Sequence, residues 1–139
     1  MESGAQATGS LLEVVREEHQ DLLLLVERLE GLVSAGIAGD DACLWRAGEV
    51  AGALKSLLVD LHYPRERSLV ERAGATHVES LRAFHYRHDL AARLLQGMCS
   101  ELARESVGWQ RFCSAAETLG DLLRVLVVEE EQLLGISPA

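Results

Sequence analysis

Five residues of two chemical types interrupt the apolar faces of the helices that this sequence predicts. They are His19, His62, Glu66, His88 and Glu130. A carboxylate buried without a partner costs several kcal/mol, so each glutamate on a core face requires compensation. One histidine in such a position is usually a hydrogen-bonded core or boundary residue, but imidazoles and carboxylates that converge in one core have a common purpose. They hold a metal ion, and we predict that these five residues are its ligands.

The spacing of these residues supports a single centre. His62 and Glu66 stand four residues apart, which places both side chains on one face of a helix. Counted along the expected helices at about 1.5 Å per residue, all five lie roughly 6 to 18 Å from the same end of the molecule. Imidazole and carboxylate without thiolate suit iron or manganese, with zinc less specific. Two carboxylates can each bridge a pair of ions, so a dinuclear non-haem iron site is the sharper prediction.

Four amphipathic helices must position these residues, because apolar residues recur at steps of three and four along four stretches. The stretches run from Ser10 to Gly31, from Asp40 or Asp41 to Gly74, from Thr76 to Ser106 and from Trp109 to Gly135. Capping boxes at residues 10–13 and 76–79 start the first and the third. Pro64 has no N–H for the carbonyl of Asp60 and is expected to kink the second. Short connections predict an all-α, up-down-up-down four-helix bundle.

Composition and charge narrow the class of protein. The chain has 139 residues, enough for one core of ordinary size, with 48% hydrophobic and 25% charged residues. Thirteen Lys and Arg against 22 Asp and Glu give a net charge of −9, which argues against nucleic acid or an anionic membrane surface as a partner. The longest apolar run covers residues 22–26, well short of the roughly 18 residues that span a bilayer.

Cysteine usage and the first residues favour a cytoplasmic protein. Cys43, Cys99 and Cys113 are odd in number and lack CxxC spacing, which is typical of buried thiols in a reducing compartment. Residues 1–9 lack the basic and apolar regions of a secretory signal. Because they are also polar, we expect a flexible N-terminus there. No feature of the sequence indicates an oligomeric state.

The order of the candidate ligands resembles the hemerythrin-like, or HHE cation-binding, domain. That family carries one histidine on its first helix, His-x-x-x-Glu on its second, one histidine on its third and His-x-x-x-Glu on its fourth. The matching stretches are Glu18-His19-Gln-Asp-Leu, His62-Tyr-Pro-Arg-Glu66, Arg87-His88-Asp-Leu and, on the last helix, Glu130. The resemblance implies a hemerythrin-like bundle domain over residues 10–139 with two carboxylate-bridged iron ions, with or without an oxo bridge. It also implies that O2, peroxide or nitric oxide binds there, in a carrier, a sensor or a peroxide-detoxifying protein.

One position departs from the family pattern. Leu126 stands four residues before Glu130, where the second His-x-x-x-Glu should begin, so one metal is short of a ligand. His85, three residues before His88, is the candidate replacement. The equal alternative is that His85 is an interfacial histidine hydrogen-bonded to a neighbour.

Four further positions near the candidate ligands have less specific interpretations. His77 precedes the third helix and is expected on the surface. Tyr63 and Tyr86 adjoin ligand positions but point off the core face, so we expect packing or boundary residues, with a tyrosinate ligand the less favoured alternative. The acidic run at residues 129–131 is expected to be solvated, with only Glu130 turned inward.

Two other functions stay open at this point. A bundle that has lost useful metal chemistry would serve as an interaction or regulatory module, and Leu126 favours this alternative. A zinc or manganese hydrolytic site ranks lower, because no nucleophile or general base stands out. Whether the protein is an enzyme depends on the role of the iron, since carriers, sensors and peroxidase-like proteins use the same core.

Overall fold

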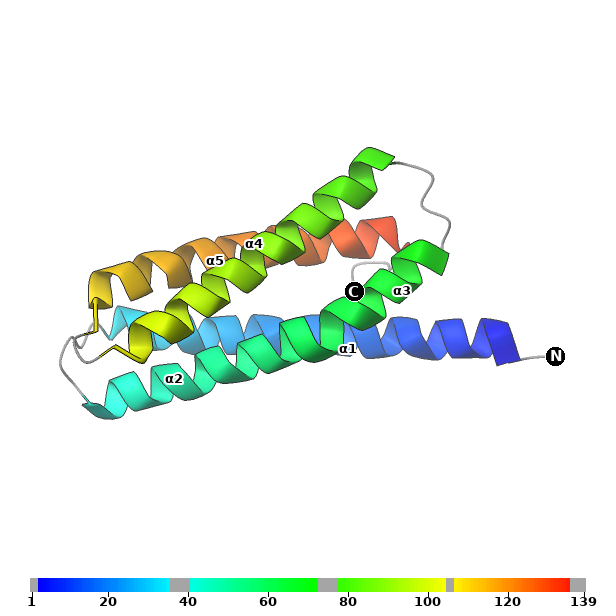
Figure 1. Cartoon of the computed structure of the whole chain (residues 1–139). Helices are drawn as coiled ribbons and strands as arrows, with labels where there is room; N and C mark the ends of the chain where they lie inside the picture. The colour runs from blue at the N-terminus through cyan, green and yellow to red at the C-terminus, as the bar shows by residue number, and fades with distance from the viewer. Residues whose placement is uncertain (1–2, 36–40, 73–77, 105–106, 136–139) are drawn as a thin grey trace.

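A computed structural model describes residues 3–35, 41–72, 78–104 and 107–135 of the chain. The regular elements of these residues are all helical: α1 (Ser3–Ser34), α2 (Asp41–Lys55), η1 (Ser56–His62), α3 (Tyr63–Arg72), α4 (Val78–Leu102) and α5 (Trp109–Leu133). Because α2, η1 and α3 continue one another, the described chain forms four helical rods that alternate in direction (Figure 1). The prediction of an all-α, four-helix protein is confirmed.

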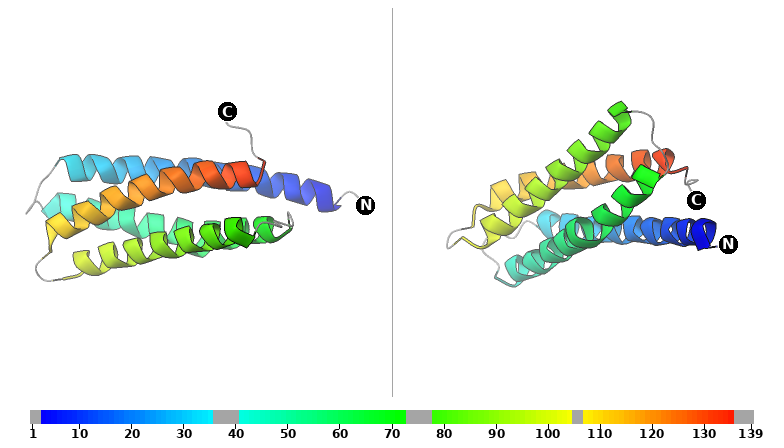
Figure 2. Two further views of the ribbon diagram at one scale, coloured as in Figure 1. Left: turned by 90° about the horizontal axis from the view of Figure 1, so that it is seen from above. Right: turned by 45° about the vertical axis from the view of Figure 1, so that its right-hand side comes forward.

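Each rod packs against two others around a shared core. Helix α1 contacts α2 and α5, and α4 contacts the same two helices from the opposite side. Figure 2 shows the rods side by side along the long axis of the molecule. Leucines fill the space between them, among them Leu22, Leu54, Leu95 and Leu123, each at most 1% exposed. Burial of each such side chain contributes about 1.5–3 kcal/mol, so the apolar faces of the helices account for their association.

The second rod changes its hydrogen-bond register just before Pro64. Helix η1 is a π-helix, and the N–H of Tyr63, which follows it, donates to the carbonyl of Leu58 instead of an i−4 carbonyl. Pro64 has no N–H to offer, so the backbone adopts the wider turn at the point where the α-helical ladder is broken in any case. The kink expected at Pro64 is thus a π-helical segment. It ends at His62 and places Glu66 in the first turn of α3.

The helix ends match the expectations in part. Helix α1 begins at Ser3, so Ser10 lies inside the helix and the N-cap expected there is wrong; alanine and glutamine in the preceding segment propagate the helix toward the N-terminus. The division into residues 1–9 and a bundle of residues 10–139 stays a prediction. The caps expected at Asp40, Gly74 and Thr76 lie outside the described residues. Gly135 follows α5 with a φ of 72°, the left-handed conformation that commonly ends a helix.

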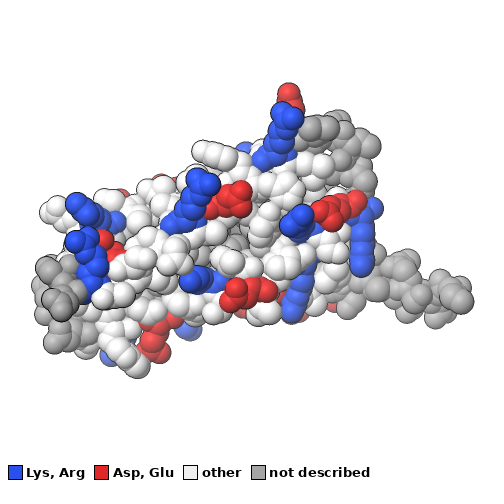
Figure 3. Space-filling model, in the orientation of Figure 1, with Lys and Arg blue, Asp and Glu red and all other residues white. Residues whose placement is uncertain are grey.

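Three further expectations concern membrane spans, thiols and surface charge. Among the described residues, none of the helices has the length and apolar character required to span a membrane. Cys43 is buried, whereas Cys99 and Cys113 are half-buried. On the face shown in Figure 3, basic and acidic side chains alternate over the helices and form no continuous basic surface.

Candidate metal centre

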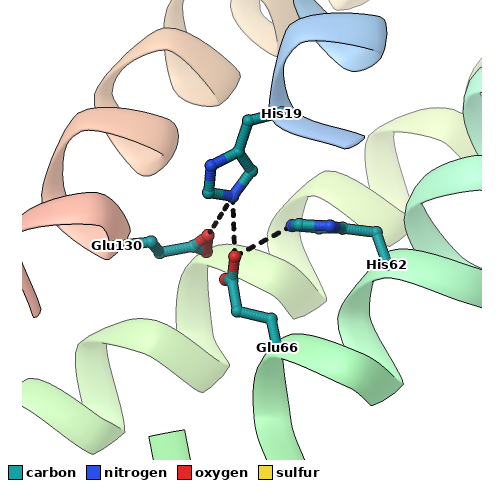
Figure 4. A group of neighbouring side chains, drawn as sticks. All are labelled: His19, His62, Glu66 and Glu130. Atoms are coloured by element: carbon teal, nitrogen blue, oxygen red, sulfur yellow. Dashed lines mark hydrogen bonds and ion pairs between the residues drawn. The ribbon is translucent and has the colours of Figure 1, made fainter. Parts of the chain in front are cut away.

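Three of the four rods contribute side chains to one buried cluster near the end of the molecule where α5 finishes, and the fourth rod, α4, places His88 beside it. His19 comes from α1, His62 from the end of η1, Glu66 from α3 and Glu130 from α5. Figure 4 shows these four side chains pointing toward one another. One possible ligand atom from each lies within 4.8 Å of the other three. They are at most 3% exposed, so the cluster is a polar layer within an apolar core.

Each of the two glutamates lies close to histidines on two sides of the cluster. Glu66 Oε2 is 2.7 Å from His19 Nε2 and 2.9 Å from His62 Nε2. The other oxygen, Glu66 Oε1, is 3.2 Å from Nε2 of His88, which comes from α4. Glu130 repeats this pattern, with Oε2 3.5 Å from His19 Nε2 and Oε1 2.5 Å from His88 Nε2. Both carboxylates therefore turn one oxygen toward the His19 side and the other toward the His88 side.

Among the described residues, three buried polar atoms of the cluster have no partner in hydrogen-bond geometry, although one of them lies within ion-pair distance of Glu66. They are His62 Nε2, His88 Nδ1 and Glu130 Oε2. A buried polar atom without a partner costs about 1–3 kcal/mol, so native cores rarely contain several together. His62 Nε2 and Glu130 Oε2 belong to the group whose ligand atoms converge, and a cation among these atoms would satisfy both. The donor set of imidazole nitrogen and carboxylate oxygen fits such an ion.

A second layer of carboxylates orients two of the histidines. His19 Nδ1 is 2.9 Å from Glu131 Oε2, and His62 Nδ1 is 3.2 Å from Glu18 Oε1. Each carboxylate accepts the Nδ1–H, which leaves the Nε2 lone pair directed into the cluster. Arg65 in turn donates to Glu18 at 3.0 Å and holds that carboxylate in place.

Sequence reasoning missed this second layer. The motif around His19 includes Glu18 but assigns it no role. The expectation that Glu131 is solvated is wrong, because its side chain is 21% exposed and reaches His19. Both glutamates stand one position away from a candidate ligand. The sequence offers one indication of their role, because a ligating histidine needs a hydrogen-bond acceptor for its second ring nitrogen.

The protonation of the cluster couples its members. Burial raises the pKa of Glu130, and the neighbouring carboxylate of Glu66 raises it further. Burial also opposes ionisation of Glu66, but hydrogen bonds from Glu130 and the histidines outweigh it and lower the pKa of Glu66. Burial disfavours the His19 imidazolium, yet hydrogen bonds to Glu66 and Glu131 prevail and raise its pKa. Without a metal, the cluster thus holds protons at positions that a cation would take.

His88 behaves differently from His19. Burial lowers the pKa of His88, and the hydrogen bond to Glu66 does not offset it. The imidazole is therefore neutral at neutral pH, which is the form that binds metals. Its ring packs against two aromatic rings, with centroids 4.3 Å from Tyr63 and 4.7 Å from Phe84.

His85, the replacement ligand considered above, is not part of this cluster in the structure. Its Nδ1 lies 2.8 Å from the hydroxyl of Tyr63, and its ring packs against Phe84. Tyr63 is a packing residue, as expected, because its ring stacks on His88. Burial raises the pKa of Tyr63 above its ordinary value, so this residue is a phenol at neutral pH. Tyr86 is 66% exposed, and His77 lies outside the described residues.

A groove between α4 and α5 reaches the cluster from the surface. Its volume is about 490 Å³, and its walls include Phe84 and Arg87 of α4 and Glu129, Glu130 and Leu133 of α5. Arg87 and Glu129 form an ion pair between the two helices. Since Glu130 belongs to both the groove and the cluster, a small molecule in the groove would lie next to one of the candidate ligands.

Comparisons of the chain with known protein families, with curated proteins and with solved structures found no match. The geometry alone therefore characterises the protein: four helical rods enclose a buried histidine and glutamate cluster that could bind a metal ion.

Proposed function

We propose that this protein binds two non-haem iron ions and that O2, peroxide or nitric oxide reacts or binds there. The observation that carries the proposal is the double orientation of Glu66 and Glu130, whose two oxygens face different histidines. Nitrogen and oxygen donors without thiolate favour iron over softer metals. The resemblance of the ligand order to the hemerythrin-like domain supports the same assignment. Carrier, sensor and peroxide-detoxifying roles are all compatible with it.

The two halves of the proposed site differ in their number of donors. On one side, His19 and His62 join an oxygen from each glutamate. On the other side, His88 is the histidine next to the remaining two oxygens. Leu126, one turn before Glu130 on α5, is fully buried and offers no donor where the hemerythrin-like pattern has a histidine. The His88 side would thus keep room for an exogenous ligand, and the groove borders Glu130, whose side chain contacts His88.

Bound iron would supply redox chemistry and an open coordination position for a diatomic or peroxide ligand. The chain itself provides the conditions for that chemistry. Glu18 and Glu131 hold two imidazoles with Nε2 directed inward. Buried leucines such as Leu22, Leu58 and Leu123 limit the access of water to the core, which strengthens the electrostatic attraction between carboxylates and cation.

Metal analysis after anaerobic reconstitution with Fe²⁺ tests the proposal. We expect more than one iron per chain, and near-ultraviolet absorption of a bridged iron pair after oxidation. Iron that stays at or below one per chain would reject the dinuclear site. A Glu129→Gln variant serves as the control, because Glu129 is an exposed neighbour of Glu130 that pairs with Arg87.

The same experiment addresses the alternative function, a bundle that acts as an interaction or regulatory module without metal. The burial of Leu126 at a position that could have carried a donor is the observation in its favour. A protein that takes up no iron, zinc or manganese after reconstitution would support this alternative over the iron site.

A further inference from the structure

Tyr63 connects the candidate metal centre to a second histidine outside it. The residue follows His62 at the start of α3. Its ring stacks on His88 with centroids 4.3 Å apart and an interplanar angle of 11°. Its hydroxyl lies 2.8 Å from His85 Nδ1. One aromatic ring thus touches a candidate ligand on its face and a histidine base at its hydroxyl.

The hydrogen bond has a defined direction. A tyrosine hydroxyl keeps its proton at neutral pH, since its ordinary pKa is about 10, so the phenol donates and His85 Nδ1 accepts. His85 then carries its own proton on Nε2. Because His85 is only half-buried, water can solvate the imidazolium that forms when Nδ1 gains a proton.

This geometry suits one-electron oxidation of a phenol. Loss of an electron makes the phenolic proton strongly acidic, so the reaction proceeds readily only where a base already holds the hydroxyl. Histidine is a common proton acceptor in such positions. The stacked ring of His88 meanwhile places Tyr63 in direct contact with the cluster from which an oxidant would act.

We propose that Tyr63 is a redox-active residue that delivers one electron through His88 to the metal centre while His85 accepts its proton. In this step the O–H bond of Tyr63 breaks and an N–H bond forms at His85 Nδ1. The products are a neutral tyrosyl radical and an imidazolium. Hydrogen peroxide is the terminal oxidant, and it takes two electrons and two protons from solvent to form two molecules of water. Two such steps therefore serve each peroxide, and after each one a small-molecule one-electron reductant in solution returns the electron to Tyr63 while the proton returns from His85.

The inference rests on the proposed function for its natural oxidant, but not for its central test. Tyr63 and Tyr86 are the two tyrosines of the chain, and Tyr86 is 66% exposed. Each Phe variant therefore leaves one tyrosine to be observed. Phenylalanine preserves the ring that stacks on His88, so Tyr63→Phe removes the hydroxyl with little change in packing.

The test is photo-oxidation of the full, metal-free chain with a ruthenium tris-bipyridine complex and persulfate, followed by electron paramagnetic resonance of the frozen sample. We expect a tyrosyl radical in the Tyr86→Phe protein that forms with a solvent deuterium isotope effect. His85→Gln in the same background should slow its formation at least about tenfold, the lower range of general-base effects. Equal yields with and without His85, or no tyrosyl signal in Tyr86→Phe, would overturn the inference.

A second arm links the pair to the metal. In the iron-loaded protein, addition of hydrogen peroxide should produce the same radical in Tyr86→Phe but not in Tyr63→Phe. If iron binds and this radical does not form, Tyr63 is not an electron donor to the centre and the inference fails. If iron does not bind at all, the proposed function fails instead, and the photo-oxidation arm still decides whether Tyr63 and His85 act together.

Discussion

The two halves of the candidate metal centre hold their histidines by different means. On one side, His19 and His62 each donate from Nδ1 to a carboxylate, Glu131 or Glu18. On the other side, His88 Nδ1 has no partner among the described residues. Its ring is held by aromatic packing instead.

Solvent exposure does not explain this difference. His19 is 1% and His88 2% exposed, yet the pKa of His19 is raised and that of His88 is lowered. Burial alone lowers the pKa of a histidine. Carboxylates lie close to both rings, but Glu131 also raises the pKa of His19. His62 and His19, in contrast, further lower the pKa of His88. The comparison indicates one half whose histidines are fixed by carboxylates and a second, neutral half whose histidine ring rests on aromatic residues.

The largest expected effect comes from the residue that both halves share. Glu66 contacts all three histidines, so Glu66→Gln should abolish binding of both ions. Loss of this buried charge should also lower the free energy of unfolding of the metal-free protein by about 3 kcal/mol, since its histidine partners are left without compensation. Metal analysis and urea unfolding measure the two effects.

Glu71→Gln provides the matched control for Glu66→Gln. Glu71 also lies on α3, but its side chain is 58% exposed and pairs with Arg67. Exposed pairs contribute at most about 1 kcal/mol, so metal content should be unchanged. Equal behaviour of the two variants would show that the cluster has no special role.

Removal of one carboxylate from the second layer should affect only the half that it supports. Glu131→Gln weakens the hold on His19, and loss of such a partner typically reduces metal affinity 10- to 100-fold. We therefore expect one iron per chain to dissociate at a lower chelator concentration, while the other is retained. Chelator titration measures this, with Glu129→Gln as the control. Simultaneous weakening of both ions would contradict the independence of the halves.

The convergence of the five candidate ligands could be predicted because it depends only on helical period and direction. His62 and Glu66 share a face at any rotation of their helix, and antiparallel rods bring all five residues to one level. Glu18 and Glu131 could not be assigned in this way. Their contacts depend on the rotation of α1 relative to its neighbours and on side-chain rotamers, neither of which a repeat of three and four specifies.

The role of His85 was left open for a similar physical reason. Its position three residues before His88 places both on neighbouring parts of the α4 surface, which allows either a ligand or an interfacial role. In the structure the ring of Tyr63 lies against His88 and its hydroxyl donates to Nδ1 of His85, which is the interfacial arrangement. The π-helix was not predicted either, because the shift to i−5 hydrogen bonds changes the register only locally around Pro64.

A change in pH should affect the stability of the metal-free protein and its affinity for iron in opposite directions. The folded pKa of His19 lies above 6.5, so its contribution to metal-free stability is complete below about pH 6.5 and is lost as pH rises through the raised pKa. The pKa of Glu130 is also raised, so its contribution to the stability of the metal-free protein is likewise lost as pH rises. Iron displaces these protons, so its affinity should increase with pH, about tenfold per unit for each proton displaced.

Thermal melting from about pH 5.5 to pH 8.5 measures this linkage. The increase in melting temperature caused by iron should grow with pH and shrink toward the acidic end. Calorimetry in buffers of different ionisation enthalpy should show proton release on binding. If the melting temperatures of the iron-bound and metal-free forms differ by the same amount at every pH, and no protons are released, the cluster does not hold the protons that iron is expected to displace.

Leu126→His tests the donor-poor half. The new imidazole would lie one turn from Glu130 in a fully buried position, where an unpaired polar group costs about 1–3 kcal/mol. Metal-free protein should therefore be less stable by that amount, whereas iron should restore the loss by binding the added donor. Denaturant unfolding with and without iron gives both values. A similar loss in the two forms would show that position 126 does not face the second ion.

The smallest expected effect belongs to His85→Ala. Its Nδ1 accepts from Tyr63, and its ring contacts lie with Tyr63 and Phe84, so iron content and the spectrum of the iron pair should match those of the unchanged protein. Stability should fall by only about 0.5–1.5 kcal/mol, the usual contribution of one hydrogen bond. Loss of one iron per chain would instead make His85 the missing ligand. Tyr63 would then have to move away from His85 when the metal binds. The half that contains His88 would gain a second histidine, as the half with His19 and His62 already has. The two halves would no longer differ in their number of histidine ligands.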